Sequence, residues 1–116
     1  MARKYDGRTG CDVEATLSVL GGRWKPVLLF HLLDGRKRFG ELCRMTPNAT
    51  QRMITLQLRE MEADGAISRE VFPEVPPRVE YELTDLGRSL EPLLLAMRSW
   101  GESYKLQEGK EQRVDG

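Results

Sequence analysis

The chain has 116 residues, 40% of them hydrophobic and 31% charged, and its formal net charge is zero. This composition fits one folded domain with a core of its own and excludes a disordered chain. No apolar run approaches the roughly 20 residues that a membrane-spanning helix needs. The first ten residues, MARKYDGRTG, are polar and carry no secretory signal, so we expect a cytoplasmic protein with no membrane partner.

The first half of the chain has the pattern of several short helices. We expect residues 1–10 to form a flexible N-terminal arm and residues 11–106 to form one domain. Apolar spacing and turn residues predict helices over residues 11–20, 24–33 and 40–45 and a short strand over residues 37–39. Gly21 and Gly22 end the first helix. A turn around Pro47 ends the third, because proline cannot continue a helix.

A fourth helix begins after Thr50, ends at Gly65 and has two different faces. Ile54, Leu58 and Met61 share one face and should point into the core. The polar residues of the other face are candidates for DNA contacts: Thr50, Gln51, Arg52, Thr55 and Arg59. Arginine and glutamine bind guanine and adenine edges through paired hydrogen bonds, and threonine can reach a thymine methyl group. Alone, this face would be an ordinary solvated surface, but the elements around it favour a recognition helix.

A β-hairpin follows the fourth helix directly. Strands are predicted over residues 67–72 and 79–83, and three prolines lie in the connection, where no donor to the sheet is needed. Arg78 near the tip is a candidate for contact with the DNA backbone or minor groove, although an ordinary surface turn is the simpler interpretation of the hairpin alone. Lys37 and Arg38 belong to a basic zone before the helix, which can attract phosphate locally despite the zero net charge.

The last predicted helix begins after Thr84 and has apolar residues at every third or fourth position. Pro92 lies inside it and should kink or split it. Its large apolar side chains exceed what a peripheral helix on so small a domain can bury, which predicts a homodimer. The candidate interface residues on this helix are Leu93, Met97, Trp100 and Tyr104. After Leu106 the chain is polar, so we expect residues 107–116 to form a flexible tail.

Several segments together resemble the HxlR family of bacterial winged helix-turn-helix transcriptional regulators. The resemblance extends from Cys11 to Tyr104. The matching segments are LGGRW at 20–24, RFGEL at 38–42, LQLREMEADG at 56–65, VPPRVEYELTDLGRSL at 75–90 and Trp100-Gly101. Three positions depart from the usual family pattern, Arg23, Asn48 and Ala49, and they leave the preferred operator open.

The resemblance implies a fold class and an assembly. The fold would be mainly α with a small β-hairpin wing (α+β), a winged helix-turn-helix with additional N- and C-terminal dimerisation helices. The recognition helix would span residues 50–63 and the wing residues 67–83. The first helix would join the last one in the dimer interface, which adds Val13 and Leu17 to the candidate interface residues.

Cys11 is the candidate regulatory residue. It lies at the start of the first helix, where the helix dipole stabilises a thiolate, and the resemblance implies a sensor of oxidants or electrophiles at this position. The alternative is a small buried apolar residue. Cys43 is more simply explained by packing, and a Cys11–Cys43 disulfide would require Cα atoms within about 7 Å.

The sequence offers no pattern for catalysis or metal binding. His31 is the one histidine, and with two separated cysteines it does not form a zinc pattern. No nucleophile and base have a recognisable spacing, so we expect no enzyme activity and no cofactor.

We therefore expect a dimeric, sequence-specific DNA-binding transcriptional regulator, a repressor or autoregulator, acting on a pseudo-palindromic operator. Two alternatives remain open. One is a winged-helix protein-interaction module without DNA binding, and the other is a regulator triggered by a small-molecule effector instead of a thiol.

Overall fold

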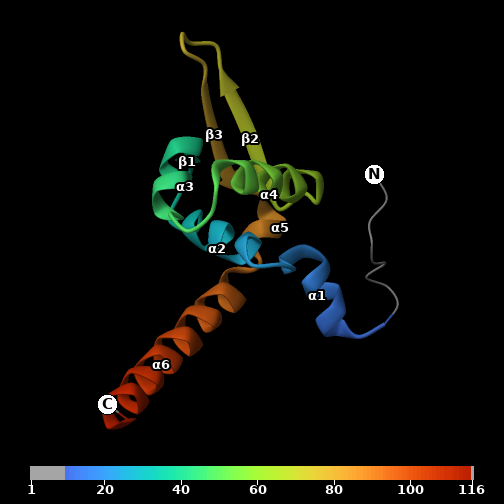
Figure 1. The fold of residues 1–116 in the computed structure, drawn as a ribbon. Coiled ribbons are helices and arrows are strands. Elements are labelled where there is room, and N and C mark those ends of the chain that lie inside the picture. The colour runs from blue at the N-terminus through green and yellow to red at the C-terminus, as the bar shows by residue number, and fades with distance from the viewer. Residues whose placement is uncertain (1–9, 116) are drawn as a thin grey trace.

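The computed structural model describes residues 10–115, with side chains described through residue 108. In chain order the elements are α1 (Asp12–Leu20), α2 (Trp24–His31), β1 (Lys37–Arg38), α3 (Phe39–Met45), α4 (Gln51–Ala63), β2 (Ile67–Phe72), β3 (Arg78–Leu83), α5 (Asp85–Arg88) and α6 (Glu91–Asp115). The hairpin of β2 and β3 rises from one side of a group of short helices, and α6 extends from the other side (Figure 1). The predicted arm at residues 1–10 lies, except for Gly10, outside the described residues.

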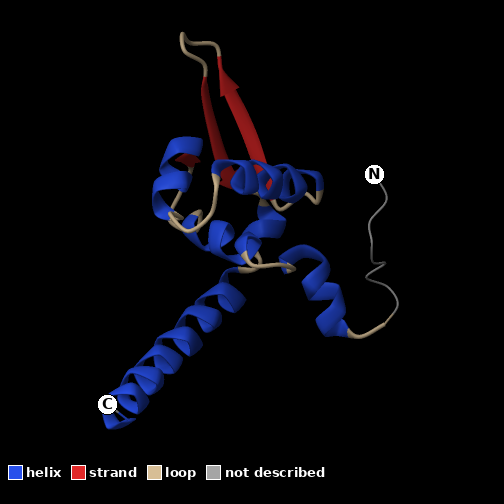
Figure 2. Cartoon of the chain, in the orientation of Figure 1, coloured by secondary structure: helices blue, strands red, loops and turns tan. Residues whose placement is uncertain are grey.

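The fold class predicted from the sequence is confirmed. Helices make up most of the described chain, and strand is found in the hairpin and the short β1 (Figure 2). The three strands form an antiparallel sheet in the order β1-β3-β2. None of the described helices is long and apolar enough to cross a bilayer.

The core lies where α2, α3, α4 and the base of the hairpin meet. Ile54, Leu58 and Met61 of α4 are buried, as their spacing predicted. They join buried side chains from the other elements: Leu20, Leu28, Leu29, Leu32, Leu42, Ala66, Ile67, Leu83 and Leu94. Full burial of an aliphatic side chain of this size stabilises the fold by about 1.5–3 kcal/mol. This core holds α4 with its polar face outward.

Local caps fix both ends of α4. The Thr50 hydroxyl accepts a hydrogen bond from the Met53 amide at 3.1 Å, the bond expected of an N-cap. Gly65 has φ +83°, a left-handed conformation that favours glycine after a helix. The chain then enters β2 within two residues, so the hairpin is placed directly beside the recognition-helix candidate.

The predicted last helix is split, as Pro92 indicated. Thr84 caps the short α5 by accepting from the Gly87 amide at 3.2 Å, and a break at Ser89 and Leu90 precedes α6. Pro92 therefore lies in the first turn of α6, where its missing N–H has no cost. The helix continues to Asp115, so the tail expected at residues 107–116 is helical as far as the chain is described. Glutamine, glutamate, lysine and arginine in this segment are good helix formers despite their polarity.

Candidate nucleic-acid interface

The outer face of α4 is open to a partner. Gln51, Arg52 and Arg59 are exposed, and Thr55 is half-buried beside them. Neither arginine forms an ion pair with another residue of the described chain. The Thr55 hydroxyl donates to the Gln51 carbonyl at 2.9 Å, which leaves its lone pairs and methyl group for a partner. Two unpaired guanidinium groups and one amide thus project from a helix fixed by its buried side.

The turn before α4 is anchored by a buried residue. Thr46 is buried at the end of α3, and its hydroxyl has no partner among the described side chains and backbone. Its carbonyl accepts from the Ala49 amide at 3.2 Å, which closes the turn. The Thr50 hydroxyl caps α4, so this residue, which was predicted to contact DNA, has a structural role as well.

A groove of about 610 Å³ lies between α4 and the hairpin. Its lining comes from β1 and the start of α3, from α4, from both hairpin strands and from the connection between them: Arg38, Phe39, Gly40, Thr55, Arg69, Glu74, Val75, Pro76, Pro77, Arg78, Val79 and Tyr81. Burial raises the pKa of the Tyr81 phenol above its ordinary value, so it is a neutral hydrogen-bond donor at physiological pH. The groove therefore combines apolar walls with guanidinium and hydroxyl donors.

Arg69 is a groove residue that the sequence analysis missed. It lies opposite Tyr81 in the sheet register, so both side chains are on the face that looks toward α4. Its Nε is 3.5 Å from a carboxylate oxygen of Glu62 at the far end of α4. The sequence could have predicted this position, because side chains alternate along β2 and Arg69 therefore lies on the same face as the buried Ile67.

All three cations predicted to contact DNA outside α4 have a carboxylate partner, although the one near Arg38, Glu80, is 4.0 Å away. Lys37 Nζ lies 2.6 Å from Asp34 Oδ1, and the Lys37 side chain is 14% exposed. This hydrogen bond with Lys37 lowers the pKa of the Asp34 carboxyl. The Arg78 side chain is 25% exposed, with Nη1 2.8 Å from Glu74. Arg38 is the most open of the three, at 59% exposed.

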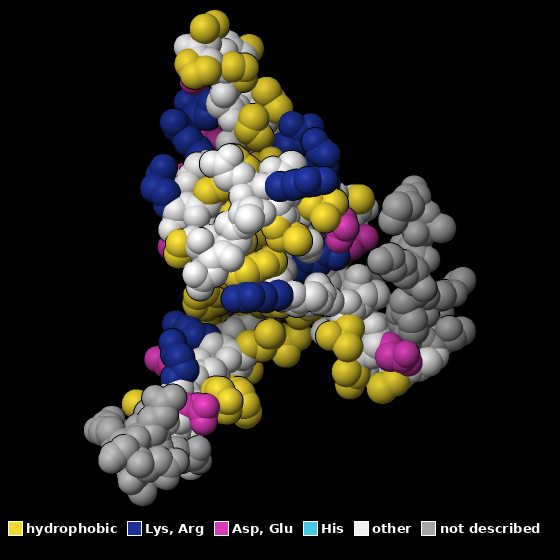
Figure 3. Space-filling model, in the orientation of Figure 1, with side chains coloured by type: hydrophobic (Ala, Val, Ile, Leu, Met, Phe, Trp, Pro, Cys, Tyr) yellow, Lys and Arg dark blue, Asp and Glu magenta, His cyan; other side chains and the backbone are white. Residues whose placement is uncertain are grey.

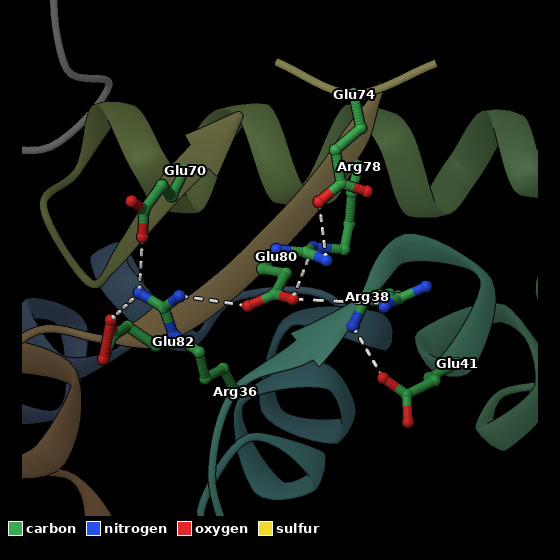
Figure 4. Close-up of polar contacts among 8 residues, drawn as sticks. All are labelled: Arg36, Arg38, Glu41, Glu70, Glu74, Arg78, Glu80 and Glu82. Atoms are coloured by element: carbon green, nitrogen blue, oxygen red, sulfur yellow. Dashed lines mark hydrogen bonds and ion pairs between the residues drawn. The ribbon is translucent and has the colours of Figure 1, made fainter. Parts of the chain in front are cut away.

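The paired arginines belong to one network on the hairpin, shown in Figure 4. Arg36 reaches Glu82 at 2.6 Å, Glu70 at 2.9 Å and Glu80 at 3.0 Å. These hydrogen bonds, led by that of Glu82, raise the pKa of the Arg36 guanidinium. The Arg38 amide donates to Glu41 at 2.8 Å, which anchors the start of α3.

A second surface, made of apolar side chains, lies on α1 and α6. All the predicted interface residues are exposed: Val13, Leu17, Leu93, Met97, Trp100 and Tyr104. Hydrophobic side chains gather on these two helices in the lower half of Figure 3. A monomeric protein rarely exposes so many large apolar groups together.

The two cysteines lie in different environments. Cys11 is exposed at the N-cap of α1, where its Sγ accepts from the Val13 amide at 3.4 Å and its own amide donates to Glu14 at 2.9 Å. The alternative of a small buried residue is therefore wrong for Cys11. Cys43 is half-buried, and burial raises the pKa of its thiol, as expected of a packing residue.

No group of three metal-ligating side chains is found within the described part of the chain. His31 is partly buried in α2, and desolvation lowers its pKa below the ordinary 6.5. The histidine is therefore a neutral, packed side chain at physiological pH.

Comparisons with known proteins agree on one class. A model described as HxlR-like helix-turn-helix matches residues 19–109. The HTH-type transcriptional regulator YdeP of Bacillus subtilis is 59% identical over 100 residues, which cover 86% of this chain and 78% of YdeP. The redox regulator HypR in its oxidized form superposes with a TM-score of 0.77 at 60% identity and covers 80% of this chain and 96% of that one. The reduced form of the regulator YodB from B. subtilis gives 0.68 at 34% identity, covering 83% and 95%.

Proposed function

The chain belongs to the HxlR-like helix-turn-helix family and is a transcriptional regulator of the winged-helix type, and on this premise we propose that it is a dimer that binds a specific DNA operator through α4. The observation that carries the proposal is the outer face of α4. Gln51, Arg52 and Arg59 project there without ion-pair partners in the described chain, from a helix whose opposite face is fully buried. These are the side chains that discriminate base edges in the major groove.

The groove beside α4 supplies contacts to the sugar-phosphate backbone. Arg38 is open to solvent, and Arg69 and the Tyr81 hydroxyl line the same groove. Guanidinium and hydroxyl donors to phosphate fix the register of a recognition helix without reading sequence. In this arrangement one DNA strand runs between α4 and the hairpin.

The apolar surfaces of α1 and α6 pair with those of a second copy. A two-fold axis between the copies presents two α4 helices to the same side of DNA, with half-sites about 34 Å apart or a multiple of it. The operator is then pseudo-palindromic. Repression or autoregulation follows when that operator overlaps the promoter that it controls.

Fluorescence anisotropy with DNA from upstream of the gene tests this proposal. A scrambled duplex of equal length and composition is the control, and both are titrated across a salt series. We expect at least about a thousand-fold preference for the operator, the lower end of specific recognition. Equal affinity for both duplexes at every salt concentration would contradict sequence-specific binding. Absence of binding at low salt would favour the protein-interaction module.

We further propose that chemical modification of Cys11 regulates binding. Its sulfur is exposed at the positive end of α1, next to Val13 of the proposed dimer surface. Addition of the thiolate to a quinone, or oxidation by diamide to a disulfide with a second thiol, changes the size and charge of a group beside the interface. The solved relative HypR is described as a redox regulator, with oxidized and reduced forms.

A Cys11→Ser protein separates this mechanism from control by a small-molecule effector. We expect diamide or a quinone to change operator affinity in the parent and leave Cys11→Ser unchanged, with Cys43→Ser as the matched control. An equal response of the parent and Cys11→Ser would exclude Cys11 as the sensor.

A further inference from the structure

One face of the three-stranded sheet carries mainly charged side chains, and Glu80 lies at its centre. In the register of the sheet, Glu80 is opposite Glu70 of β2 and Arg38 of β1. Side chains opposite one another share a face, and so do side chains two residues apart along one strand. Arg78 and Glu82 of β3 therefore belong to the same face.

The Glu80 carboxylate joins three arginines. Oε1 lies 3.0 Å from Arg36 Nη1, and Oε2 lies 3.1 Å from Arg78 Nε and 4.0 Å from Arg38 Nε. In Figure 4 Glu80 lies between Arg36 on one side and Arg38 and Arg78 on the other. The Glu80 side chain is 17% exposed, whereas Glu70 and Glu82 are each about half exposed. Its ion pairs are accordingly the least screened of the network.

Arg78 is the least exposed of the three arginines in this network. Its guanidinium lies over the Phe72 ring, 4.0 Å from the centroid, and also pairs with Glu74 at 2.8 Å. Glu74 is near the hairpin tip and half exposed, so its pair is weak and sensitive to salt. The more shielded partner of Arg78 is Glu80, whose Oε2 lies 3.1 Å from Arg78 Nε as an ion pair without hydrogen-bond geometry.

Pairing of this kind limits what the hairpin can contribute to DNA affinity. The face sets Arg36, Arg38 and Arg78 against four carboxylates, those of Glu70, Glu74, Glu80 and Glu82. A cation adds affinity by releasing counterions from a phosphate that it neutralises. A phosphate that took Arg78 from Glu80 would remove the nearest cation from Oε2 of this shielded carboxylate and leave that oxygen with Arg38 at 4.0 Å, so the gain would be reduced.

We propose that Glu80 is a positioning residue that holds Arg78 away from DNA phosphate and so limits affinity for DNA of arbitrary sequence. Recognition is thereby left to the base-reading face of α4. This inference rests on the proposed DNA binding and gives a new role to the hairpin: its wing arginine is an internal partner of Glu80, and the Glu80 carboxylate sets the charge that the wing offers.

Substitution of Glu80 tests the inference, with Glu70→Gln as the matched control. Both changes remove one negative charge from the same face. Within the described part of the chain Glu70 forms an ion pair with Arg36 alone, and Glu80 and Glu82 still hold that arginine, so the control releases no arginine. The measurement is the affinity for a scrambled duplex as a function of salt, in the full-length dimer.

We expect Glu80→Gln to make the slope of log affinity against log salt more negative by about 0.9, which is the value for one added phosphate contact. At about 0.15 M salt, Glu80→Gln should bind scrambled DNA about five-fold more tightly than Glu70→Gln does. Adding Arg78→Ala to Glu80→Gln should return the slope to the parental value. Glu80→Asp, which keeps the carboxylate, should stay near the parent. A purely structural role for Glu80 would change the unfolding temperature without this pattern of slopes.

Identical slopes for Glu80→Gln and Glu70→Gln would overturn the inference while leaving the proposed function intact. Failure of the parent to bind DNA at low salt would overturn both. If Glu80→Gln does not fold, the single variant Arg78→Ala decides: its slope should equal that of the parent, and loss of about 0.9 would mean that Arg78 contacts phosphate after all.

Discussion

The indole of Trp100 stacks on the ring of Tyr104 on the outer side of α6, with centroids 5.3 Å apart and planes at 12°. Both rings are exposed, Trp100 by 69% and Tyr104 by 52%. Two aromatic rings in contact on a solvated helix leave most of their apolar area in water, which is unfavourable unless a partner covers them. The pair therefore belongs to the surface that the proposed dimer would bury.

Trp100→Ala should weaken the dimer. Buried tryptophans are frequent hot spots, and loss of about 2 kcal/mol or more corresponds to a dimer dissociation constant raised by about 30-fold. Analytical ultracentrifugation across a concentration series measures this directly. Val75→Ser is the control, because Val75 is exposed at the hairpin tip, far along the chain from α6. A Trp100→Ala protein as dimeric as the parent would contradict the proposed interface.

Arg52→Ala should reduce operator affinity and relax base preference. A guanidinium that binds a base edge contributes about 1–3 kcal/mol of discrimination, so the substitution should cost roughly 5- to 150-fold in operator affinity. Binding to scrambled DNA should fall much less. Arg98→Ala, which removes the same charge from the exposed side of α6, is the matched control. If Arg52→Ala weakened operator and scrambled DNA equally, Arg52 would be a phosphate contact.

Elements with local signals were predictable. The buried stripe of α4, its Thr50 cap and the end at Gly65 follow from spacing and from backbone chemistry within a few residues. The strands were placed within one residue, because alternation and prolines mark their ends. The prediction of a flexible tail after Leu106 was wrong, because it considered only the polarity of this segment. Its residues have a high helix propensity, and α6 continues to Asp115.

The charge arrangement of the hairpin was not predictable from the sequence. Arg36 meets Glu70 and Glu82, which are 34 and 46 residues away, so their pairing depends on the strand register. From the sequence, Arg78 beside two prolines was predicted to be a cation available to DNA. The pairing of β2 with β3 places Glu80 and Phe72 next to its guanidinium. Residue type identifies the cations, whereas their availability to a phosphate depends on tertiary pairing.

Gly87→Ala should destabilise the fold strongly. A Cβ at Gly87 would lie 2.1 Å from the Ala66 carbonyl oxygen and 3.1 Å from a methyl group of Leu83. Because the first atom is backbone at the base of the hairpin, α5 would have to move, and overpacking of this kind costs about 1–3 kcal/mol or more. Gly40→Ala is the control: its Cβ meets only the end of the Arg44 side chain, at 3.5 Å, and removal of a helical glycine should stabilise by about 0.5–1 kcal/mol. Urea unfolding measures both, and equal midpoints would contradict the close approach.

Stability should fall as the pH decreases from about 7 to 5, and His31 should be responsible. Burial lowers the pKa of His31 in the folded protein below the ordinary 6.5, so the unfolded chain binds this proton more readily. Where the unfolded state binds more protons, stability rises with pH. The contribution of His31 is therefore complete above its unfolded pKa and decreases below it. Asp34, whose pKa lies below the ordinary 3.8, affects stability only at more acidic pH.

His31→Gln isolates this effect, because glutamine is polar and does not titrate. Thermal unfolding of the parent and the variant at several pH values between about 5 and 7.5 should give a falling midpoint for the parent and a flatter profile for His31→Gln. Lys25→Gln is the control: it removes a positive charge from the same helix but keeps the imidazole, so loss of its ion pair with Glu60 should lower the midpoint at every pH and leave the parental pH dependence. Parallel profiles for parent and His31→Gln would mean that other groups carry the acid sensitivity, and that desolvation of the imidazole by α2 and its neighbours is too small to matter.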